Sequence, residues 1–465
     1  MSITPAPRYP LVIAGARVKT ATWDSVRDRT TGEVIGEVAA AQPADVERAI
    51  RAAHDALPVW AARTPSERAG HLSRYAALLR NHAETIAALI HREEGKPLGE
   101  AQAETARSIE VVEYFAGEAE RLATSHIAGP AAATGSYIRP TPIGVVAAIT
   151  PWNFPVALVL WKLAPALAAG CTIIVKPAAE APLAAWMLCD LAEQAGIPPG
   201  VVGCVTGDGP AIGEALATHP LIAKVAFTGS RRVAETIAAW TAPRLKALTL
   251  ELGGHGALVV MDDADLDVAV DVALVQGYAN AGQACYSVNR VLVPHALEGA
   301  FLERFRARMG EVTLGPMATD RGVSRHHMLL EDARTKGATV EGGELVAPGR
   351  LAPALVTGAA PGVALIDEEP FTPIVAVMGV TDIDAAIAEA NRPDYGLVNY
   401  ICGRDLRATT TAATALKSGT VVMNGWRVVV PYAPYAGWRG SGVGTELGRP
   451  GHESFIAWQH LRVLA

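Results

Sequence analysis

Hydrophobic residues near the start of the chain recur at the spacing of an α-helix. Five apolar positions that follow Asp45 share one helical face: Val46, Ala49, Ile50, Ala53 and Leu57. Thr64 then supplies an N-cap, Pro65 the first helical position and Glu67 the third, which is the pattern of a capping box. The pattern therefore predicts two helices, one starting near Asp45 and one at Pro65.

From about residue 143, short apolar runs alternate with helical segments. The runs are Ile143–Ile149, Cys171–Val175, Val201–Val205, Lys224–Phe227 and Ala247–Leu250, and helical spacing covers Ala181–Ala195 and Arg232–Trp240. The runs lack clean alternation, as expected of strands that are covered on both faces. The alternation predicts a parallel, doubly wound sheet, whose ligands bind at the carboxyl ends of its strands.

A second series of apolar runs begins after Glu251. The expected strands are Ala257–Val260, Arg290–Val293 and Ile374–Met378, and the expected helices are Ala264–Val275 and Leu297–Met309. They predict a second α/β unit. Scattered Gly, Pro and Thr over residues 125–142 predict a segment that leaves the first unit.

Composition narrows the class of protein. The chain has 465 residues, 50% hydrophobic and 19% charged, which is typical of a folded protein with two or three units. Its net charge is −7 without basic runs, which disfavours nucleic acids and anionic membranes as partners. The most apolar stretch, 155–175, is interrupted by Lys162 and Pro165, so we expect a buried helix and strand there instead of a membrane span.

Cysteine usage and the first residues point to a reducing compartment. The five cysteines include no CxxC pair, so we expect neither a disulfide framework nor a metal site. The segment MSITPAPRYP does not read as a signal peptide, and we therefore expect a cytoplasmic protein. Four of the cysteines lie in apolar runs and are expected in the core: Cys171, Cys189, Cys204 and Cys402.

Three polar residues follow predicted strands or helices and carry candidate chemistry. Cys285 follows a small polar turn, where nearby dipoles or cations would favour a nucleophilic thiolate. Glu251 stands between two leucines, which suits a general base with a raised pKa, and Asn153 stands between prolines as a rigid amide donor for an oxyanion. Taken alone, each has an ordinary alternative: a core cysteine, a solvated glutamate and a turn-forming asparagine.

Two further strand ends carry groups that could bind a nucleotide. Lys176 ends one strand, and the sequence Phe-Thr-Gly-Ser at 227–230 joins a strand to a helix whose N-terminus can approach a pyrophosphate. Gly207, Gly209 and Gly213 have the wrong spacing for a dinucleotide fingerprint, and we assign them no phosphate role. All these stretches lie at successive strand ends or element junctions, where an α/β sheet forms its ligand crevice.

The chain resembles the aldehyde dehydrogenase superfamily over nearly its full length. The resemblance rests on eight motifs in the family's order: PWNFP (151–155), VKP (175–177), FTGS (227–230), LELGG (250–254), GQAC (282–285), EEPF (368–371), YGL (395–397) and SGVG (441–444). It implies an NAD(P)+-dependent oxidoreductase that converts an aldehyde to a carboxylic acid. A binding or structural protein that kept this fold without catalysis, as family lens crystallins did, is disfavoured because Cys285, Glu251 and Asn153 are all retained.

The resemblance also implies roles for individual residues. Cys285 would attack the aldehyde, Asn153 and the backbone N–H of Cys285 would hold the oxyanion of the thiohemiacetal, and Glu251 would activate the water that hydrolyses the thioester. Glu251 argues against members that form acyl-CoA, which generally lack this base. Lys162 and Glu446 resemble a secondary proton path. The implied NAD(P) contacts are Thr150, Trp152, Lys176, Gly229, Ser230, Leu252, Glu369 and Phe371.

The family's architecture implies three parts and an oligomer. Residues 1–122 and 143–250 would form a Rossmann-like NAD(P)-binding domain, and residues 251–450 an α/β catalytic domain. Residues 123–142 and 451–465 would form a small β bridging unit. Because such added strands pair with a neighbour's sheet, we expect a homodimer or homotetramer.

The chain departs from the family at the cofactor and substrate positions. NAD-preferring members usually carry a glutamate where Ala179 stands, so we expect NADP+ to be accepted as well as NAD+. Members acting on succinate semialdehyde carry arginines where Trp161 and Ala279 stand, so we expect an uncharged, apolar or aromatic aldehyde. The alternative is a semialdehyde or other charged aldehyde bound by Arg427.

The expected substrate pocket is largely aromatic. Its members are Phe154, Trp161, Tyr286, Arg427 and Tyr435, although ordinary core packing is an equal alternative for each aromatic ring. Tyr435 stands in the sequence Pro-Tyr-Ala-Gly at 434–437, where the family usually has PFGG.

Overall fold

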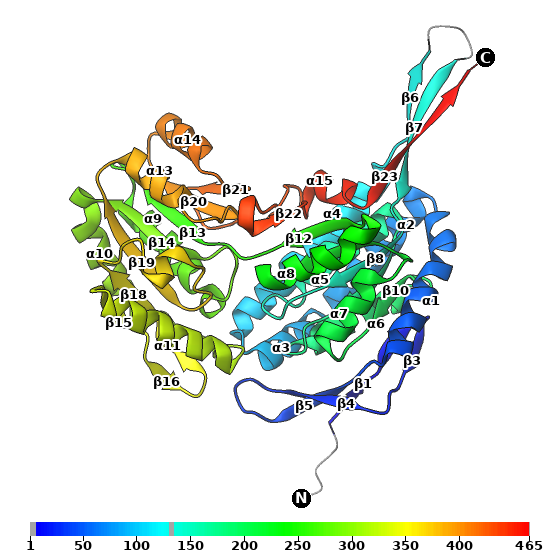
Figure 1. Ribbon diagram of the computed structural model, residues 1–465, viewed down its shortest axis with the longest axis horizontal. Helices are drawn as coiled ribbons and strands as arrows, with labels where there is room; N and C mark the ends of the chain where they lie inside the picture. Colours follow the sequence, from blue (N-terminus) through cyan, green and yellow to red (C-terminus); the bar gives the residue numbers. More distant parts are fainter. Residues whose placement is uncertain (1–5, 130–133, 465) are drawn as a thin grey trace, which may run out of the picture.

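The computed structural model describes residues 6–129 and 134–464. These residues form two lobes, and a narrow three-stranded sheet extends from one of them (Figure 1). The expectation that MSITPAPRYP is not a signal peptide rests partly on residues 1–5, and these lie outside the described residues. Residues 130–133 and 465 of the expected bridging unit also lie outside them.

The first lobe is built on an eight-stranded sheet with the order β22-β12-β11-β8-β9-β10-β2-β3. Its strands are β2 (Leu11–Ile13), β3 (Ala16–Val18), β8 (Val145–Ile149), β9 (Thr172–Lys176), β10 (Val202–Cys204), β11 (Ile222–Thr228), β12 (Ala247–Glu251) and β22 (Gly442–Val443). Strands β8 to β12 pair in parallel, so the five strands predicted here are confirmed.

Both faces of this sheet are covered, as the unbroken apolar runs predict. In β8, Val146 and Ala148 pack into one hydrophobic core, whereas Val145 and Ala147 pack into another on the opposite face. The helices of this lobe are α1 (Pro43–Ala61), α2 (Pro65–Asn81), α3 (Ala83–Glu94), α4 (Leu98–Glu120), α5 (Ala157–Ala169), α6 (Pro182–Gln194), α7 (Gly209–Thr218) and α8 (Arg231–Thr241).

The capping box at the start of α2 is confirmed. The Thr64 hydroxyl accepts a hydrogen bond from the Glu67 amide, and the Glu67 carboxylate accepts one from the Thr64 amide at 2.8 Å. The apolar stretch after residue 155 forms the expected buried helix, because every residue of α5 is buried, Lys162 and Pro165 included. Within the described residues, no helix has the length and apolar character needed to cross a membrane.

The second lobe contains a seven-stranded sheet with the order β15-β18-β19-β14-β13-β20-β21. Its strands are β13 (Gly256–Val260), β14 (Val288–Pro294), β15 (Thr339–Gly342), β18 (Ala354–Thr357), β19 (Ile374–Val380), β20 (Val398–Cys402) and β21 (Thr420–Met423). Its helices are α9 (Leu266–Tyr278), α10 (His295–Met309), α11 (Asp320–Thr335), α12 (Ala364–Asp367), α13 (Ile383–Asn391) and α14 (Leu406–Ala415). A second α/β unit is thus confirmed, and the mixed α/β fold with it.

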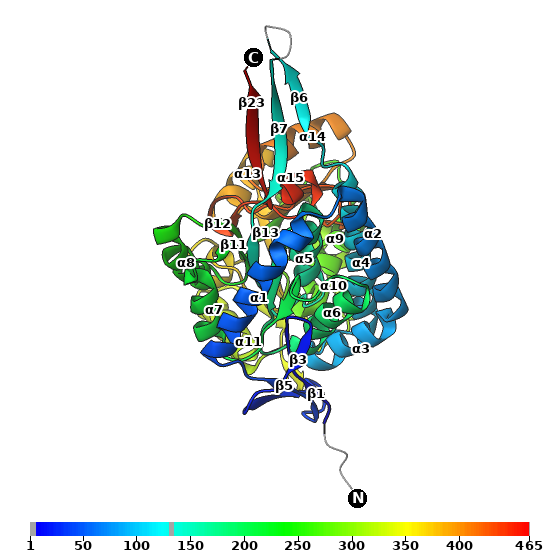
Figure 2. The ribbon, with the colours of Figure 1, turned by 90° about the vertical axis from the view of Figure 1, so that its right-hand side faces the viewer.

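The extending sheet joins two distant segments of the chain. Strand β7 (Gly135–Pro142) pairs antiparallel with both β6 (Ser125–Ala128) and β23 (Ile456–Val463). Figures 1 and 2 show these strands standing away from both lobes. Several apolar side chains on them are exposed, among them Ile127, Trp458 and Leu461.

Candidate active site

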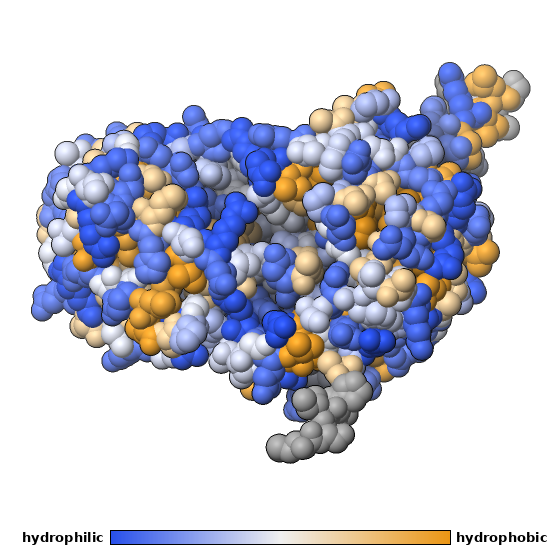
Figure 3. Space-filling view, turned by 60° about the horizontal axis from the view of Figure 1, so that its bottom comes forward, coloured by the Kyte–Doolittle hydropathy of each residue, from blue (hydrophilic) through white to orange (hydrophobic). Residues whose placement is uncertain are grey.

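The carboxyl ends of four parallel strands meet at one edge of the first sheet. Ile149 pairs with Lys176 at the ends of β8 and β9, and Thr228 pairs with Glu251 at the ends of β11 and β12. The loops that follow these strands therefore leave the sheet side by side. The segment after β12 runs on into the second lobe, and Figure 3 shows the surface hollowed between the two lobes.

Cys285 follows a tight turn after α9. Asn280 and Ala281 adopt the left-handed conformation, and Gly282 has a φ of 72°. A Cβ atom at Gly282 would lie 2.2 Å from the carbonyl oxygen of Thr372, so this close approach requires glycine. Part of Cys285 is exposed, whereas the four cysteines expected in the core are buried.

Asn153 is held against the turn that carries Cys285. Its side-chain amide donates to the carbonyl of Gln283 at 2.9 Å. Its backbone carbonyl accepts hydrogen bonds from Lys96 Nζ at 2.7 Å and from the side-chain amide of Asn280 at 3.0 Å. These bonds join the loop after β8 to the turn before Cys285, although the two are far apart in sequence.

A buried charge cluster that the sequence analysis missed supports this loop. Lys96 Nζ lies 2.5 Å from the Glu104 carboxylate and 3.2 Å from that of Glu94, and all three side chains are buried. The Glu104 carboxylate also accepts the backbone amides of Val156 and Ala157. Burial opposes the charge of Lys96, but the two carboxylates raise its pKa, so Lys96 remains a cation at neutral pH. Nothing in the segment Glu-Glu-Gly-Lys-Pro at 93–97 distinguishes these charges from solvated ones.

Glu251 ends β12 as a buried carboxylate. No side chain of residues 6–129 and 134–464 forms a hydrogen bond with its carboxylate oxygens. Burial raises its pKa well above the ordinary value, and the neighbouring charge of Glu446 adds to this effect, while Lys162 opposes it. The raised pKa predicted from the flanking leucines is confirmed in direction.

The pairing of β12 with β22 explains why Glu446 lies near Glu251. Glu251 pairs with Gly442 in that ladder, which brings the chain that follows β22 beside the strand end. Glu446 then forms a buried ion pair of 2.7 Å with Lys162, and Lys162 Nζ also donates to the Thr228 hydroxyl at 2.7 Å. The two residues of the expected proton path are therefore in contact with each other.

The pKa of Cys285 differs from the sequence-based expectation. We expected nearby dipoles or cations to lower it, but desolvation, together with the charges of Glu369 and Glu251, raises it to about 12. A hydrogen bond of 3.3 Å with the Tyr435 hydroxyl acts in the opposite direction. The resting thiol is therefore neutral, and its proton must be removed before it can attack.

The residues expected to bind NAD(P) offer suitable polar groups. Lys176 Nζ is buried and donates to the Pro177 carbonyl at 3.0 Å, and the buried Thr150 hydroxyl has no hydrogen-bond partner in the structure. Glu369 accepts the Gly254 amide at 2.9 Å through one carboxylate oxygen, and burial raises its pKa to about 7. An ammonium group, a hydroxyl and a carboxylate fit the ribose hydroxyls of a dinucleotide.

The other expected cofactor contacts lie around these groups. Gly229 lies so close to the ring of Phe227 that a Cβ atom there would be 2.5 Å from it, and its amide donates to the Glu251 carbonyl. Trp152 packs edge-to-face on Phe371 with 5.8 Å between ring centroids. The remaining two are Ser230, the N-cap of α8, and Leu252, whose amide donates to the Ser441 carbonyl.

A cavity of about 810 Å³ is lined by Phe154 and Tyr286, the residues that directly follow Asn153 and Cys285 in the sequence. These two rings pack 5.6 Å apart. The loop residues Trp426 to Val429 line it too, and Arg427 forms a loose, exposed ion pair of 3.6 Å with Glu110. Arg107 and Arg308, which the sequence analysis missed, also line it. Trp161 and Tyr435 are outside the lining and pack on each other instead.

The chain is similar to known proteins over nearly its whole length. Residues 18–461 match the Aldehyde dehydrogenase family. Glutarate-semialdehyde dehydrogenase of Pseudomonas putida is 37% identical and aligns over 94% of this chain and 93% of its own length. 3-Sulfolactaldehyde dehydrogenase, also of Pseudomonas putida, is 37% identical over 93% and 92%. The crystal structure of an NADP-dependent enzyme of E. coli superposes with a TM-score of 0.96 at 34% identity and covers 98% of both chains. This chain belongs to the aldehyde dehydrogenase family.

Proposed function

We propose that the protein oxidises an aldehyde to a carboxylic acid with NAD(P)+, through a thioester on Cys285 that water hydrolyses. The observation that carries the proposal is the convergence of three groups from separate segments. Asn153 is bonded to the turn before Cys285, and the charges of Glu251 and Cys285 interact. A nucleophile, an amide donor and an unpaired carboxylate in one place are what acyl chemistry at a sulfur requires.

In the first half of the reaction, Cys285 Sγ passes its proton to the carboxylate of Glu251, which releases it to solvent, and attacks the aldehyde carbon. The oxygen of the resulting thiohemiacetal lies between the Cys285 amide and the side-chain amide of Asn153. That side chain has two N–H donors, and one of them remains bonded to the Gln283 carbonyl. Asn153 can therefore hold the oxyanion without losing its own support, because Lys96 and Asn280 fix its backbone.

In the second half, Glu251 takes a proton from the water that attacks the thioester. Its carboxylate can accept this proton because no side chain in the described part of the chain is hydrogen-bonded to it. The pair formed by Glu446 and Lys162 lies beside Glu251 and provides the next groups that can exchange the proton. A carboxylate with a raised pKa is a stronger base than an exposed one, which suits this step near neutral pH.

Lys176 and Glu369 would hold the ribose hydroxyls of the cofactor, and Thr150, Trp152, Gly229, Ser230, Leu252 and Phe371 would surround them. The chemistry that NAD(P)+ supplies when it is bound is the acceptance of a hydride ion. Ala179 is exposed close to Lys176 in sequence and leaves room for a 2′-phosphate. Structure neighbours include an NADP-dependent enzyme and complexes with NAD+, which supports the use of either cofactor.

For the substrate, we propose an aldehyde that carries an anionic group at its far end. The named relatives act on glutarate semialdehyde and 3-sulfolactaldehyde, and these comparisons favour the charged alternative over the uncharged aldehyde that we expected from Trp161 and Ala279. Three arginines and four glutamates line the cavity; because Arg308 is paired with Asp271, Arg427 and Arg107 are the arginines that can supply positive charge to an anion there. Arg427 pairs only loosely with Glu110, so it can turn toward an anion without breaking a buried contact.

A second candidate is an apolar or aromatic aldehyde, because Phe154, Tyr286, Val428 and Val429 line the same cavity. A panel of aliphatic, aromatic and semialdehyde substrates separates the two. If the substrate is the anionic aldehyde, Arg427→Gln should lower kcat/KM for semialdehydes about tenfold and leave kcat/KM for benzaldehyde unchanged. If benzaldehyde is preferred and Arg427→Gln changes neither rate, the substrate is the apolar one.

The activity itself is tested by a burst of NAD(P)H absorbance on adding aldehyde, which is abolished in Cys285→Ala. A protein that keeps the fold without catalysis would give no burst with any aldehyde of the panel.

We also propose a homodimer or homotetramer. The exposed apolar side chains on β6, β7 and β23 support it, since a protruding sheet with a free edge invites pairing with another copy. Sedimentation of the intact protein tests this, and a monomer at micromolar concentration rejects it.

The cytoplasmic location stays a prediction from the sequence.

A further inference from the structure

The Tyr435 hydroxyl lies 3.3 Å from the sulfur of Cys285. Tyr435 stands in the sequence Pro-Tyr-Ala-Gly, whereas the usual family motif PFGG has a phenylalanine at this position. The aromatic ring fits either residue, but only tyrosine brings a hydrogen-bonding group to the sulfur. The hydroxyl is therefore a feature of this chain's site that the motif alone does not imply.

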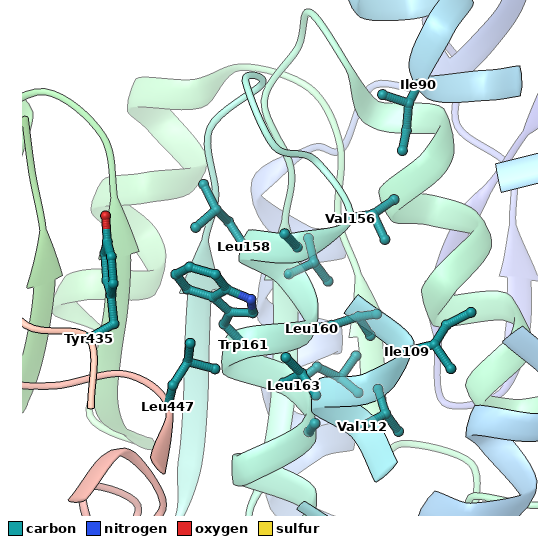
Figure 4. Packing of buried hydrophobic residues seen from close by; sticks show 14 of the residues in the cluster. Ile90, Ile109, Val112, Val156, Leu158, Leu160, Trp161, Leu163, Tyr435 and Leu447 are labelled. Carbon is teal, nitrogen blue, oxygen red and sulfur yellow. The ribbon is translucent and has the colours of Figure 1, made fainter. Parts of the chain in front are cut away.

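Tyr435 is fixed from two sides. Its backbone amide donates to the Glu446 carbonyl at 2.7 Å, and the Glu446 amide donates to the Tyr435 carbonyl at 2.8 Å. Its ring packs edge-to-face on Trp161 with 5.2 Å between centroids. Figure 4 shows the two rings facing each other, with the phenolic oxygen at the end remote from Leu447. Only 4% of Tyr435 is exposed, so the hydroxyl has little freedom to leave the sulfur.

The direction of the hydrogen bond depends on the state of the sulfur. With a neutral thiol, either atom can donate, but a thiolate can only accept. Burial raises the pKa of Tyr435 well above its ordinary value, and the adjacent thiol raises it further, so the phenol keeps its proton. The hydroxyl can therefore donate once the thiol has ionised.

The other titratable groups that face the sulfur do not favour the anion. The carboxylates of Glu251 and Glu369 repel a negative charge on Cys285. Tyr286 and Tyr400 also face it, but the Tyr400 hydroxyl donates to the Tyr286 carbonyl at 2.6 Å. Among the described residues, Tyr435 is the one whose side chain is recorded in a hydrogen bond with the sulfur.

We propose that the Tyr435 hydroxyl is a catalytic group that donates a hydrogen bond to the ionised sulfur of Cys285 and so promotes formation of the nucleophile. The proposal rests on the function proposed for Cys285. No atom is transferred, because the phenolic proton stays on its oxygen while the thiol proton leaves to a base. The hydroxyl thus offsets part of the free-energy cost that burial and the carboxylates of Glu251 and Glu369 add to ionisation of the Cys285 thiol.

The test is alkylation of Cys285 by iodoacetamide, which requires neither aldehyde nor cofactor. In Tyr435→Phe the ring and its packing on Trp161 remain, and only the oxygen is lost. A hydrogen bond to a charged group corresponds to about one to two pKa units, so the thiolate fraction falls about 10- to 100-fold. A more basic thiolate is also a stronger nucleophile, and on a logarithmic scale this offsets about half of the loss in alkylation rate that the smaller thiolate fraction causes. We expect the alkylation rate below pH 9 to fall about 3- to 10-fold.

Tyr432→Phe is the matched control, because Tyr432 lies in the same loop but is 69% exposed. It should leave the rate unchanged, and Cys285→Ala should abolish labelling, since the other four cysteines are buried. Removing an oxygen only widens the approach to the sulfur, so a purely steric role predicts an equal or faster rate in Tyr435→Phe, and that result overturns the proposal.

The same variants separate this proposal from the proposed function. Absence of an NAD(P)H burst in the unmodified protein would reject the function of Cys285, whereas the alkylation rates would still report on the bond between Tyr435 and the sulfur. If the burst is normal and the alkylation rate of Tyr435→Phe does not fall, the tyrosine proposal alone is rejected.

Discussion

The ammonium group of Lys162 lies 2.7 Å from the carboxylate of Glu446, and both side chains are buried. Glu251 lies within electrostatic reach of both, but among the described residues no side chain forms a hydrogen bond with its carboxylate oxygens. The three residues come from a strand end, a buried helix and the segment after β22. Their arrangement leaves one carboxylate unpaired next to Cys285 and neutralises the other, which divides the proposed roles of base and proton path between them.

The electrostatics of this trio predict opposite shifts in the pH dependence of turnover. Because the pKa of Glu251 is raised, its base form is present only above that pKa, so kcat should rise with pH to a plateau. Lys162 lowers this pKa and Glu446 raises it. Lys162→Met should therefore move the rising limb to higher pH and Glu446→Gln to lower pH, each by about one unit. Profiles of kcat against pH check this, and shifts in the same direction would contradict it.

Loss of the Asn153 amide should slow the chemical step without changing the reactivity of the thiol. Removing one oxyanion donor costs about 100- to 1,000-fold in kcat. Asn153→Ala should therefore show this fall in the rate of the NAD(P)H burst, with an unchanged rate of alkylation of Cys285. Equal losses in both rates would mean that Asn153 only maintains the shape of the turn.

The buried cluster around Lys96 should be a large contributor to stability. Removing the cation leaves Glu94 and Glu104 buried without their counterion, and breaking a buried pair in this way costs about 3–5 kcal/mol. Lys96→Met should lower the free energy of unfolding by this amount in denaturant titrations. The matched control is Arg449→Met, because Arg449 forms an exposed ion pair with Glu453 and should cost less than about 1 kcal/mol. Similar losses in both variants would refute the argument.

The choice of cofactor should depend on residue 179. With Ala179 there is no carboxylate at that position to repel a 2′-phosphate, so the ratio of kcat/KM for NAD+ and NADP+ should lie within about a hundredfold, or roughly 2.7 kcal/mol. Ala179→Glu should reduce kcat/KM for NADP+ at least tenfold and leave that for NAD+ within a few fold. An unmodified enzyme that rejects NADP+ by more than this limit would disprove the prediction.

The parts of the fold with one dominant pattern could be predicted from the sequence. Strands β8 to β12 are mostly buried, so their residues form largely apolar runs without clean alternation, and Thr64 with Glu67 marks the start of α2 by local chemistry alone. The small sheet of β1 (Arg8–Tyr9), β4 (Trp23–Arg27) and β5 (Val34–Ala39) was missed. Its strands are short or partly exposed, so their apolar residues form no clear pattern.

Some residues of the candidate site could be predicted from the sequence, and others could not. Cys285, Glu251 and Asn153 stand in motifs that occur in the sequence as continuous stretches. Lys96 was missed because a lysine close to two glutamates in the sequence is typical of an exposed surface. Its burial depends on packing between α3, α4 and the loop after β8. The contact between Tyr435 and Cys285 joins residues 150 positions apart, and a distance of that kind follows only from the folded chain.

The most direct test of the account is to trap the thioester. In Glu251→Gln, the side chain keeps its shape but cannot take a proton from water, so the acyl group should remain on Cys285 after one turnover. Intact-protein mass spectrometry of this variant, quenched after mixing with aldehyde and NAD(P)+, should show one acyl group per chain on Cys285, with one equivalent of NAD(P)H and steady-state turnover at least 100-fold lower. Full turnover in Glu251→Gln without an adduct, or an adduct on another residue, would contradict the account.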